Sequence, residues 1–203
     1  MKRSDVQLLF AIWQGFGLMI VAALVLMIIF RWGETLPFLI QLFTIDNQSL
    51  LFVIGIGVVS GLVMALVVTG VLVLTGTELP DNEMTRILER IIRMPGGLVT
   101  VGLGAGFAEE FLFRGALVGL FLDTFPAWLV LLLNALLFMA LHIPQYRGEP
   151  FMHLTILVMG FWLAFLFYFT GSLLAPVIAH ALYNTILGWH LRKTSANRHV
   201  QSE

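Results

Sequence analysis

Long apolar runs separated by short polar stretches dominate the chain. A helix needs about 20 apolar residues to cross the roughly 30 Å hydrocarbon core of a bilayer, and six runs are about that long. Proline bounds the shortest run on both sides, at Pro126 and Pro144, where it can begin or stop a helix. We therefore expect an all-α fold, a polytopic membrane helix bundle with about six transmembrane helices. The expected spans are 6–30, 49–74, 97–122, 126–143, 151–170 and 172–190.

Two connections between the spans are not simple loops. Apolar residues recur at helical spacing in 81–94, and Asp81 or Asn82 can cap the start of such a helix. This stretch indicates an amphipathic helix on the cytoplasmic surface, either a simple anchor or a gate or docking site for substrate. The segment 36–43 is apolar but short, and it is either interfacial or re-entrant on the outer side. The stripe in the amphipathic helix consists of Met84, Ile87, Leu88, Ile91 and Ile92.

Composition supports a membrane protein and excludes several kinds of site. Of the 203 residues, 59% are hydrophobic and only 11% are charged, whereas soluble domains are typically about 25% charged. A net charge of −1 gives no reason to expect a nucleic-acid partner. The absence of cysteine excludes disulfides, thiolate metal sites and a cysteine nucleophile.

The basic residues set the expected orientation. With the N-terminus in the cytoplasm, nearly all of the 11 Lys and Arg residues face the cytoplasm, as the positive-inside rule requires. Only Arg31 lies outside, and Arg114 lies within the membrane. The first apolar run exceeds the roughly 7–15 residues of a signal-peptide core, so we expect a retained helix. We therefore expect a plasma (inner) membrane protein with both termini in the cytoplasm.

Few ionisable side chains fall inside the expected spans. A charge at mid-bilayer costs about 2.5–3.5 kcal/mol on insertion scales, so three charges in one helix should face the bundle interior and serve a function. Asn134 is expected to form an interhelical hydrogen bond, and His153, near a span end, to be structural. The polar set within the spans is Glu109, Glu110, Arg114, Asn134, His142, His153, His180 and Asn184.

Helix geometry divides the two adjacent glutamates. Glu110 and Arg114 are four residues apart and share a face, so they can form an ion pair. Glu109 lies about 100° round the helix from Glu110, given about 3.6 residues per turn. It is therefore the freer carboxylate. A carboxylate without a nearby cation in a low-dielectric site is a plausible general base.

Two further pairs each share a helix face. His142 follows Phe138 by one turn, and His180 precedes Asn184 by one turn. At about 1.5 Å per residue, Glu109 and His180 each lie roughly 18 Å from the cytoplasmic ends of their spans, whereas His142 lies only about 7 Å in. The depths of Glu109 and His180 favour one common site. His142 joins it only if its span tilts or the loop after it is buried.

Three motifs occur in order along the chain: "EEFLFRG" at 109–115, "FMALH" at 138–142 and "SLLAPVIAHALYN" at 172–184. They resemble the EExxxR, FxxxH and HxxxN motifs of the CAAX protease and bacteriocin-processing (CPBP, or Abi) family. The resemblance covers roughly 97–190 and implies a multi-pass membrane endopeptidase, similar to type II CAAX prenyl endopeptidases. Eukaryotic members remove the last three residues of prenylated CAAX proteins, and bacterial members are linked to bacteriocin maturation, self-immunity and protein sorting.

The resemblance also implies roles for the polar residues. Glu109 and His142 would activate the attacking water, and His180 and Asn184 would stabilise the oxyanion. The substrate would be a peptide or protein, either lipidated or carrying a sorting tail, but the sequence does not identify it. The chain would form one integral membrane domain, 1–203, with N-terminal spans in 1–96, a catalytic core in 97–190 and a polar tail in 191–203. The supporting residues would be Glu110, Arg114 and Phe138.

A metal-free mechanism is the favoured interpretation, and zinc is the alternative. Glu109, His142 and His180 could supply three zinc ligands and leave the fourth place to water. In that case Glu110 would have to act as the base while Arg114 holds it. The chain lacks an HExxH motif, and no two of its histidines lie one turn apart. No other cofactor is expected.

Three other functions are compatible with buried ionisable groups. A proton-coupled transporter uses such groups in its relay, although no internal repeat is evident here. A haem protein could use His142 and His180 as axial ligands, but it has no need of the EExxxR set. A non-catalytic immunity or scaffold protein of the same fold is the third alternative.

Overall fold

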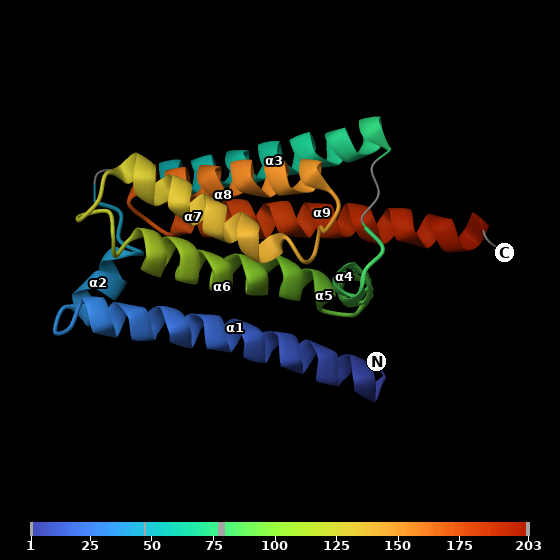
Figure 1. Cartoon of the computed structure of the whole chain (residues 1–203), viewed down its shortest axis with the longest axis horizontal. Helices are drawn as coiled ribbons and strands as arrows, with labels where there is room; N and C mark the ends of the chain where they lie inside the picture. Colours follow the sequence, from blue (N-terminus) through green and yellow to red (C-terminus); the bar gives the residue numbers. More distant parts are fainter. Residues whose placement is uncertain (1, 47, 77–79, 202–203) are drawn as a thin grey trace.

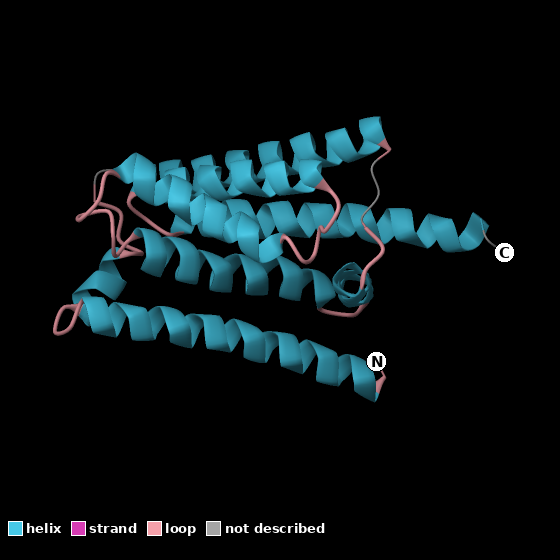
Figure 2. Ribbon diagram, in the orientation of Figure 1, coloured by secondary structure: helices cyan, strands magenta, loops and turns pink. Residues whose placement is uncertain are grey.

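The computed structural model describes residues 2–46, 48–76 and 80–201, and within these ranges the regular structure is entirely helical (Figure 2). In this described part, nine segments are α-helices and two are π-helices, labelled η, in which the turns are wider. An all-α architecture is thus confirmed for the described part of the chain. The segments are α1 (Arg3–Phe30), α2 (Thr35–Gln41), α3 (Leu50–Thr75), α4 (Glu83–Arg93), α5 (Gly97–Val99), η1 (Thr100–Ala105), α6 (Gly106–Glu110), η2 (Phe111–Val118), α7 (Ala127–His142), α8 (Pro150–Thr170) and α9 (Leu174–Gln201).

Successive long helices run in alternate directions, so the N- and C-terminal ends lie on the same side of the bundle (Figure 1). The short helix α4 lies at that end, and α2 lies at the opposite end beside the end of α1 (Figure 1). This alternation is what repeated membrane crossings require.

Among the described residues, three helices are long and apolar enough to cross a membrane: α1, α3 and α8. The apolar helix α7 is shorter, at 16 residues. The run expected as one span over 97–122 is instead divided among α5, η1, α6 and η2, and its helix ends at Val118. The chain is therefore a membrane-embedded helical protein, while the count of about six spans stays a prediction.

The helix α1 is the least buried of the three long apolar helices. Only 11% of its most apolar stretch is buried, compared with 39% for α3 and 44% for α8. Its buried contacts are concentrated at Ala23 and Met27, which pack in a core cluster with Phe38 and Leu42 of the α2 region. Many of the other apolar side chains of α1 are exposed on the surface of the bundle.

The helix α4 matches the expected amphipathic stretch 81–94. Its N-cap is Asn82, whose Oδ1 accepts a hydrogen bond of 3.0 Å from the Thr85 amide. The alternative cap, Asp81, instead forms an exposed ion pair with Arg86 at 2.6 Å. The segment 36–43, expected to be either interfacial or re-entrant, is largely the short helix α2. The Leu42 carbonyl oxygen accepts a 2.7 Å hydrogen bond from the Leu173 amide, and this bond connects the segment to the turn before α9.

Small residues allow α3 and α9 to pack closely. A Cβ on Gly57 would lie 2.8 Å from the Ala175 carbonyl oxygen, and one on Gly61 would lie 2.7 Å from that of Ala179. Neither position therefore tolerates a side chain unless the helices move apart. This spacing of small residues is typical of close helix pairs in membranes. It holds α9, which carries His180, at the centre of the bundle.

Candidate active site

A cavity of about 390 Å³ brings together side chains from seven helical segments and from the turn after α7. Glu109 reaches it from α6, His142 from the end of α7, and His180 and Asn184 from α9. Phe138 also lines it, one turn before His142. The structure thus places all four predicted catalytic residues at one site. Apolar side chains complete the wall, among them Ile12 and Phe16 of α1 and Met84, Ile87, Leu88 and Ile91 of α4.

The helix that carries the two glutamates is irregular on both sides of them. Thr100–Ala105 and Phe111–Val118 are π-helical, and the short α-helix Gly106–Glu110 lies between these segments. π-Helical turns are rare and occur frequently at functional sites. The π-helical segment after Glu110 still keeps Arg114 on nearly the same face, because four residues remain close to one turn.

Glu110 and Arg114 form a buried ion pair behind the cavity. The Arg114 Nη1 donates to Glu110 Oε1 at 2.9 Å, and both side chains are fully buried. The other terminal nitrogen, Nη2, donates to the Gly160 carbonyl of α8 at 2.9 Å. The pairing expected from the four-residue spacing is therefore confirmed, and it joins η2 to α8. Glu109, by contrast, keeps 19% of its side chain exposed.

The hydrogen-bond partners of the two histidines fix their tautomers. The His142 Nδ1 lies 2.8 Å from the Phe138 carbonyl oxygen, which can only accept, so this nitrogen carries the proton. In neutral His142 the Nε2 atom then has a free lone pair. The His180 Nδ1 lies 2.7 Å from Glu110 Oε1, which already accepts from Arg114, so His180 donates there. Its Nε2 lies 3.9 Å from Glu109 Oε2, too far for a direct hydrogen bond.

The Phe138 ring is a shared wall between the ion pair and the histidines. The Arg114 guanidinium carbon lies 4.6 Å from its centroid, a cation–π distance. The His142 ring centroid is also 4.6 Å away, and that of His180 is 6.1 Å away. Phe138 therefore fixes the relative positions of groups from three helices, consistent with the supporting role that the resemblance implies.

Asn184 has less free hydrogen-bonding capacity than its motif suggests. Its Nδ2 donates to the Val101 carbonyl oxygen of η1 at 3.1 Å. An amide nitrogen has two protons, so one N–H stays available to the cavity. The side chain is thereby held in one orientation.

The donor types suit zinc, but their spacing does not. Two Nε2 lone pairs and a carboxylate are ordinary zinc ligands, and ligating histidines commonly donate their other N–H, as both do here. Within the described ranges, however, no three His, Asp or Glu side chains lie close enough together to hold a metal ion.

The cavity also includes residues that the motifs did not indicate. Gln145 and Tyr146, on the turn between α7 and α8, lie in its wall beside the stripe of α4. The Gln145 Nε2 donates to the Tyr146 hydroxyl at 3.0 Å. No motif covers this turn, and only its position just after His142 could have suggested it. His153 and Asn134 are not among the cavity-lining residues.

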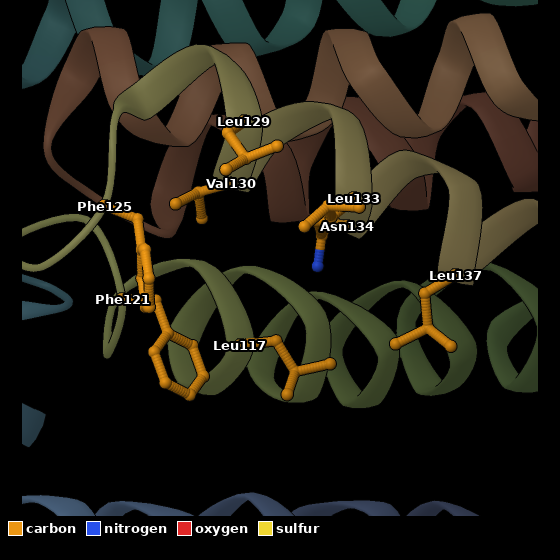
Figure 3. A pocket seen from close by; sticks show the side chains of 8 residues that line it. All are labelled: Leu117, Phe121, Phe125, Leu129, Val130, Leu133, Asn134 and Leu137. Carbon is orange, nitrogen blue, oxygen red and sulfur yellow. The ribbon is translucent and has the colours of Figure 1, made fainter.

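A second pocket, between η2 and α7, holds none of the predicted catalytic residues (Figure 3). Its volume is about 320 Å³, and Asn134 is the one polar side chain among those that line it. The Asn134 Nδ2 donates to the Phe113 carbonyl oxygen at 2.9 Å, which confirms the interhelical hydrogen bond expected of this residue. The apolar lining consists of Leu117, Phe121, Phe125, Leu129, Val130, Leu133 and Leu137.

Comparison with known proteins agrees with the motifs. Residues 93–186 match the family model described as "Type II CAAX prenyl endopeptidase Rce1-like". No curated protein and no solved structure matches the chain. The matched range contains the whole of α5 to α8, the two π-helical segments and the part of α9 with His180 and Asn184. It favours a membrane protease over a transporter or a haem protein, and such an enzyme acts on a peptide or protein. This part of the chain, 94 of its 203 residues, is similar to the CAAX protease and bacteriocin-processing family.

Proposed function

We propose that this protein is an intramembrane endopeptidase that hydrolyses a peptide bond near the C-terminus, or in a leader, of a membrane-associated substrate. One observation carries the proposal: hydrogen-bond acceptors and donors from α6, α7 and α9 converge on a single cavity, within the region of the family match. Glu109 is the only carboxylate that lines it among the described residues.

The acceptors suit activation of water. The Glu109 carboxylate and the Nε2 lone pair of neutral His142 can each accept a hydrogen bond from one water molecule. As the water oxygen attacks the scissile carbonyl carbon, its proton passes to one of these acceptors and the carbonyl oxygen becomes an oxyanion. When the tetrahedral intermediate collapses, the C–N bond breaks and the same proton moves to the leaving amine. No external reactant other than water is required.

The donors suit the oxyanion. Asn184 has one free N–H, and His180 can donate from Nε2 only as the imidazolium, because its Nδ1 proton is committed to Glu110. The contact with the Glu110 carboxylate holds the His180 ring in this orientation. Preset donors at an oxyanion each contribute about 2.7–4 kcal/mol of transition-state stabilisation. Arg114 in turn holds Glu110 in place.

The cavity lies toward the end of the bundle that carries both termini, as do α4 and the turn after α7 (Figure 1). We assign this end to the cytoplasm because the basic residues gather there, and the membrane to the plasma (inner) membrane. The substrate would then be cleaved on the cytoplasmic side, and it would carry a lipid group or a sorting tail that brings it to the bilayer.

The experiment uses purified protein in detergent micelles and two synthetic peptides that end in a CAAX sequence, one S-farnesylated and one not. Mass spectrometry identifies the fragments. We expect the wild type to release the C-terminal tripeptide and Glu109→Gln to release none, with unchanged thermal stability. Glu83→Gln, an exposed carboxylate on α4, is the matched control and should retain full activity.

A comparison of N-terminal peptides from membrane extracts treated with wild type or Glu109→Gln extends the search to leader substrates. Cleavage products that depend on Glu109 support the proposal. If the wild type and Glu109→Gln give the same fragments in both assays, the peptidase assignment to this cavity is wrong.

A further inference from the structure

The turn between α7 and α8 places a tyrosine in the wall of the proposed active site. The Tyr146 amide donates to the His142 carbonyl oxygen at 3.2 Å, so Tyr146 begins one turn beyond the proposed water-activating histidine. Only 9% of Tyr146 is exposed, and its side chain lines the same cavity as Glu109, His180 and Asn184. A buried tyrosine usually has a partner for its hydroxyl. In this structure the partner is Gln145, which leaves the Tyr146 O–H without an acceptor among the described residues of the cavity.

The hydroxyl of Tyr146 accepts a hydrogen bond but has its own proton to give. Gln145 Nε2 donates to it at 3.0 Å, so the bond uses a lone pair of the oxygen and leaves the O–H free to donate. Gln145 is also held from α4, because Asn82 Nδ2 donates to the Gln145 carbonyl oxygen at 2.7 Å. The pair is thus fixed in orientation before any substrate binds, which is the condition for effective transition-state stabilisation.

The proton stays on the hydroxyl at functional pH. Burial, with a smaller contribution from the charge of Glu109, raises the pKa of Tyr146 to about 12. A group that remains protonated cannot serve as the base. The Tyr146 hydroxyl can serve as a hydrogen-bond donor, and it interacts electrostatically with the Glu109 carboxylate.

The proposed reaction requires a hydrogen-bond donor of this kind at the oxyanion. The nucleophile side requires acceptors, which Glu109 and the His142 Nε2 supply. On the oxyanion side, Asn184 gives one N–H to Val101, and His180 must first be protonated. A neutral hydroxyl in the wall of the same cavity complements these two donors.

We propose that Tyr146 is a further catalytic residue, which donates its hydroxyl proton in a hydrogen bond to the scissile carbonyl oxygen as that oxygen becomes tetrahedral, and that Gln145 positions it. The hydrogen bond transfers no proton, so the balance of the reaction is unchanged. This inference rests on the proposed function and adds a residue from outside the three motifs.

The test measures kcat and KM of Tyr146→Phe on a peptide that the wild type cleaves. We expect kcat to fall about a hundredfold, as for the loss of one oxyanion donor, while KM changes little. Tyr168→Phe is the matched control, because Tyr168 is half exposed on α8 and outside the cavity, and it should behave as the wild type. Gln145→Leu should lower kcat less, and it should have no further effect in the Tyr146→Phe background.

A structural role gives a different result. Tyr146→Phe keeps the aromatic ring and removes only the hydroxyl. If the role of Tyr146 is structural, the variant should show a lower unfolding temperature together with a lower kcat, and stabilising lipid should restore both. Combining Tyr146→Phe with Asn184→Ala should cost less than the product of the single effects if both bind one oxygen. Wild-type kcat in Tyr146→Phe, with Glu109→Gln inactive, overturns this inference alone. Equal cleavage by wild type and Glu109→Gln overturns the proposed function instead.

Discussion

Replacing Arg114 tests whether the buried ion pair holds the site together. Arg114 and Glu110 are both fully buried, and Arg114 also binds the Gly160 carbonyl and stacks over Phe138. Arg114→Ala leaves the Glu110 carboxylate without its cation and removes all three contacts. Breaking a buried pair by removing one partner costs about 3–5 kcal/mol, a large share of the roughly 5–15 kcal/mol that stabilises a folded protein.

The size of this effect depends on burial rather than distance. The ion pair between Arg86 and Asp81 is as short, at 2.6 Å, but its side chains are 68% and 79% exposed. Water screens such a pair, so Arg86→Ala should leave the unfolding midpoint unchanged within error. Arg114→Lys should fall between the two, because it keeps the charge but not the planar group that reaches both Glu110 and Gly160.

The assay is unfolding of purified protein in mixed micelles by increasing mole fraction of SDS, followed by circular dichroism. The order of stability expected is wild type and Arg86→Ala, then Arg114→Lys, then Arg114→Ala. If Arg114→Ala fails to fold at all, Arg114→Lys still tests the order. An Arg114→Ala protein as stable as Arg86→Ala would refute the reasoning, since it would mean that the Glu110 carboxylate has no need of a cation.

The remaining predictions concern the donors, the metal and the topology. His180→Ala and Asn184→Ala should each lower kcat about 10²–10³-fold in a peptide cleavage assay, and the double variant should lose less than the product; strictly multiplicative losses would separate the two residues. Active wild-type protein should contain no stoichiometric zinc by elemental analysis and should keep its activity in a strong chelator; one zinc per chain, lost together with activity, would make His180 a ligand. Arg147→Cys gives the cysteine-free chain a single exposed thiol, which a membrane-impermeant reagent should reach from the cytoplasmic side only, and labelling from outside intact cells would reverse the orientation.

Local spacing predicted the features that lie within one helix. The Glu110–Arg114 pair follows from four-residue spacing, because the geometry of a helix is intrinsic to its backbone. The helical stretches were predicted for the same reason, from apolar runs and from prolines and caps at their ends. Asn82 rather than Asp81 is the cap of α4, a choice that the sequence left open.

Several features that depend on packing between helices were not predicted from the sequence. The hydrogen bond from His180 to Glu110 joins residues 70 positions apart, and only the fit of α9 against α6 brings them together. The division of the 97–122 run into α and π segments depends on the same packing. Helical spacing alone also made His142 too shallow for the site, yet the structure places it in the cavity wall. Tyr146 lies on a turn without periodicity, so no pattern indicated it.

The low burial of α1 links the cavity to the bilayer itself. This helix has 28 residues and is therefore about 42 Å long, which exceeds the roughly 30 Å hydrocarbon core. A helix of this length tilts more in a thin membrane than in a thick one. Because Ile12 and Phe16 of α1 form part of the cavity wall, the width of the cavity should follow the acyl-chain length of the surrounding lipid. Cleavage rates in vesicles of graded thickness would register this dependence, and equal rates across the series would exclude it.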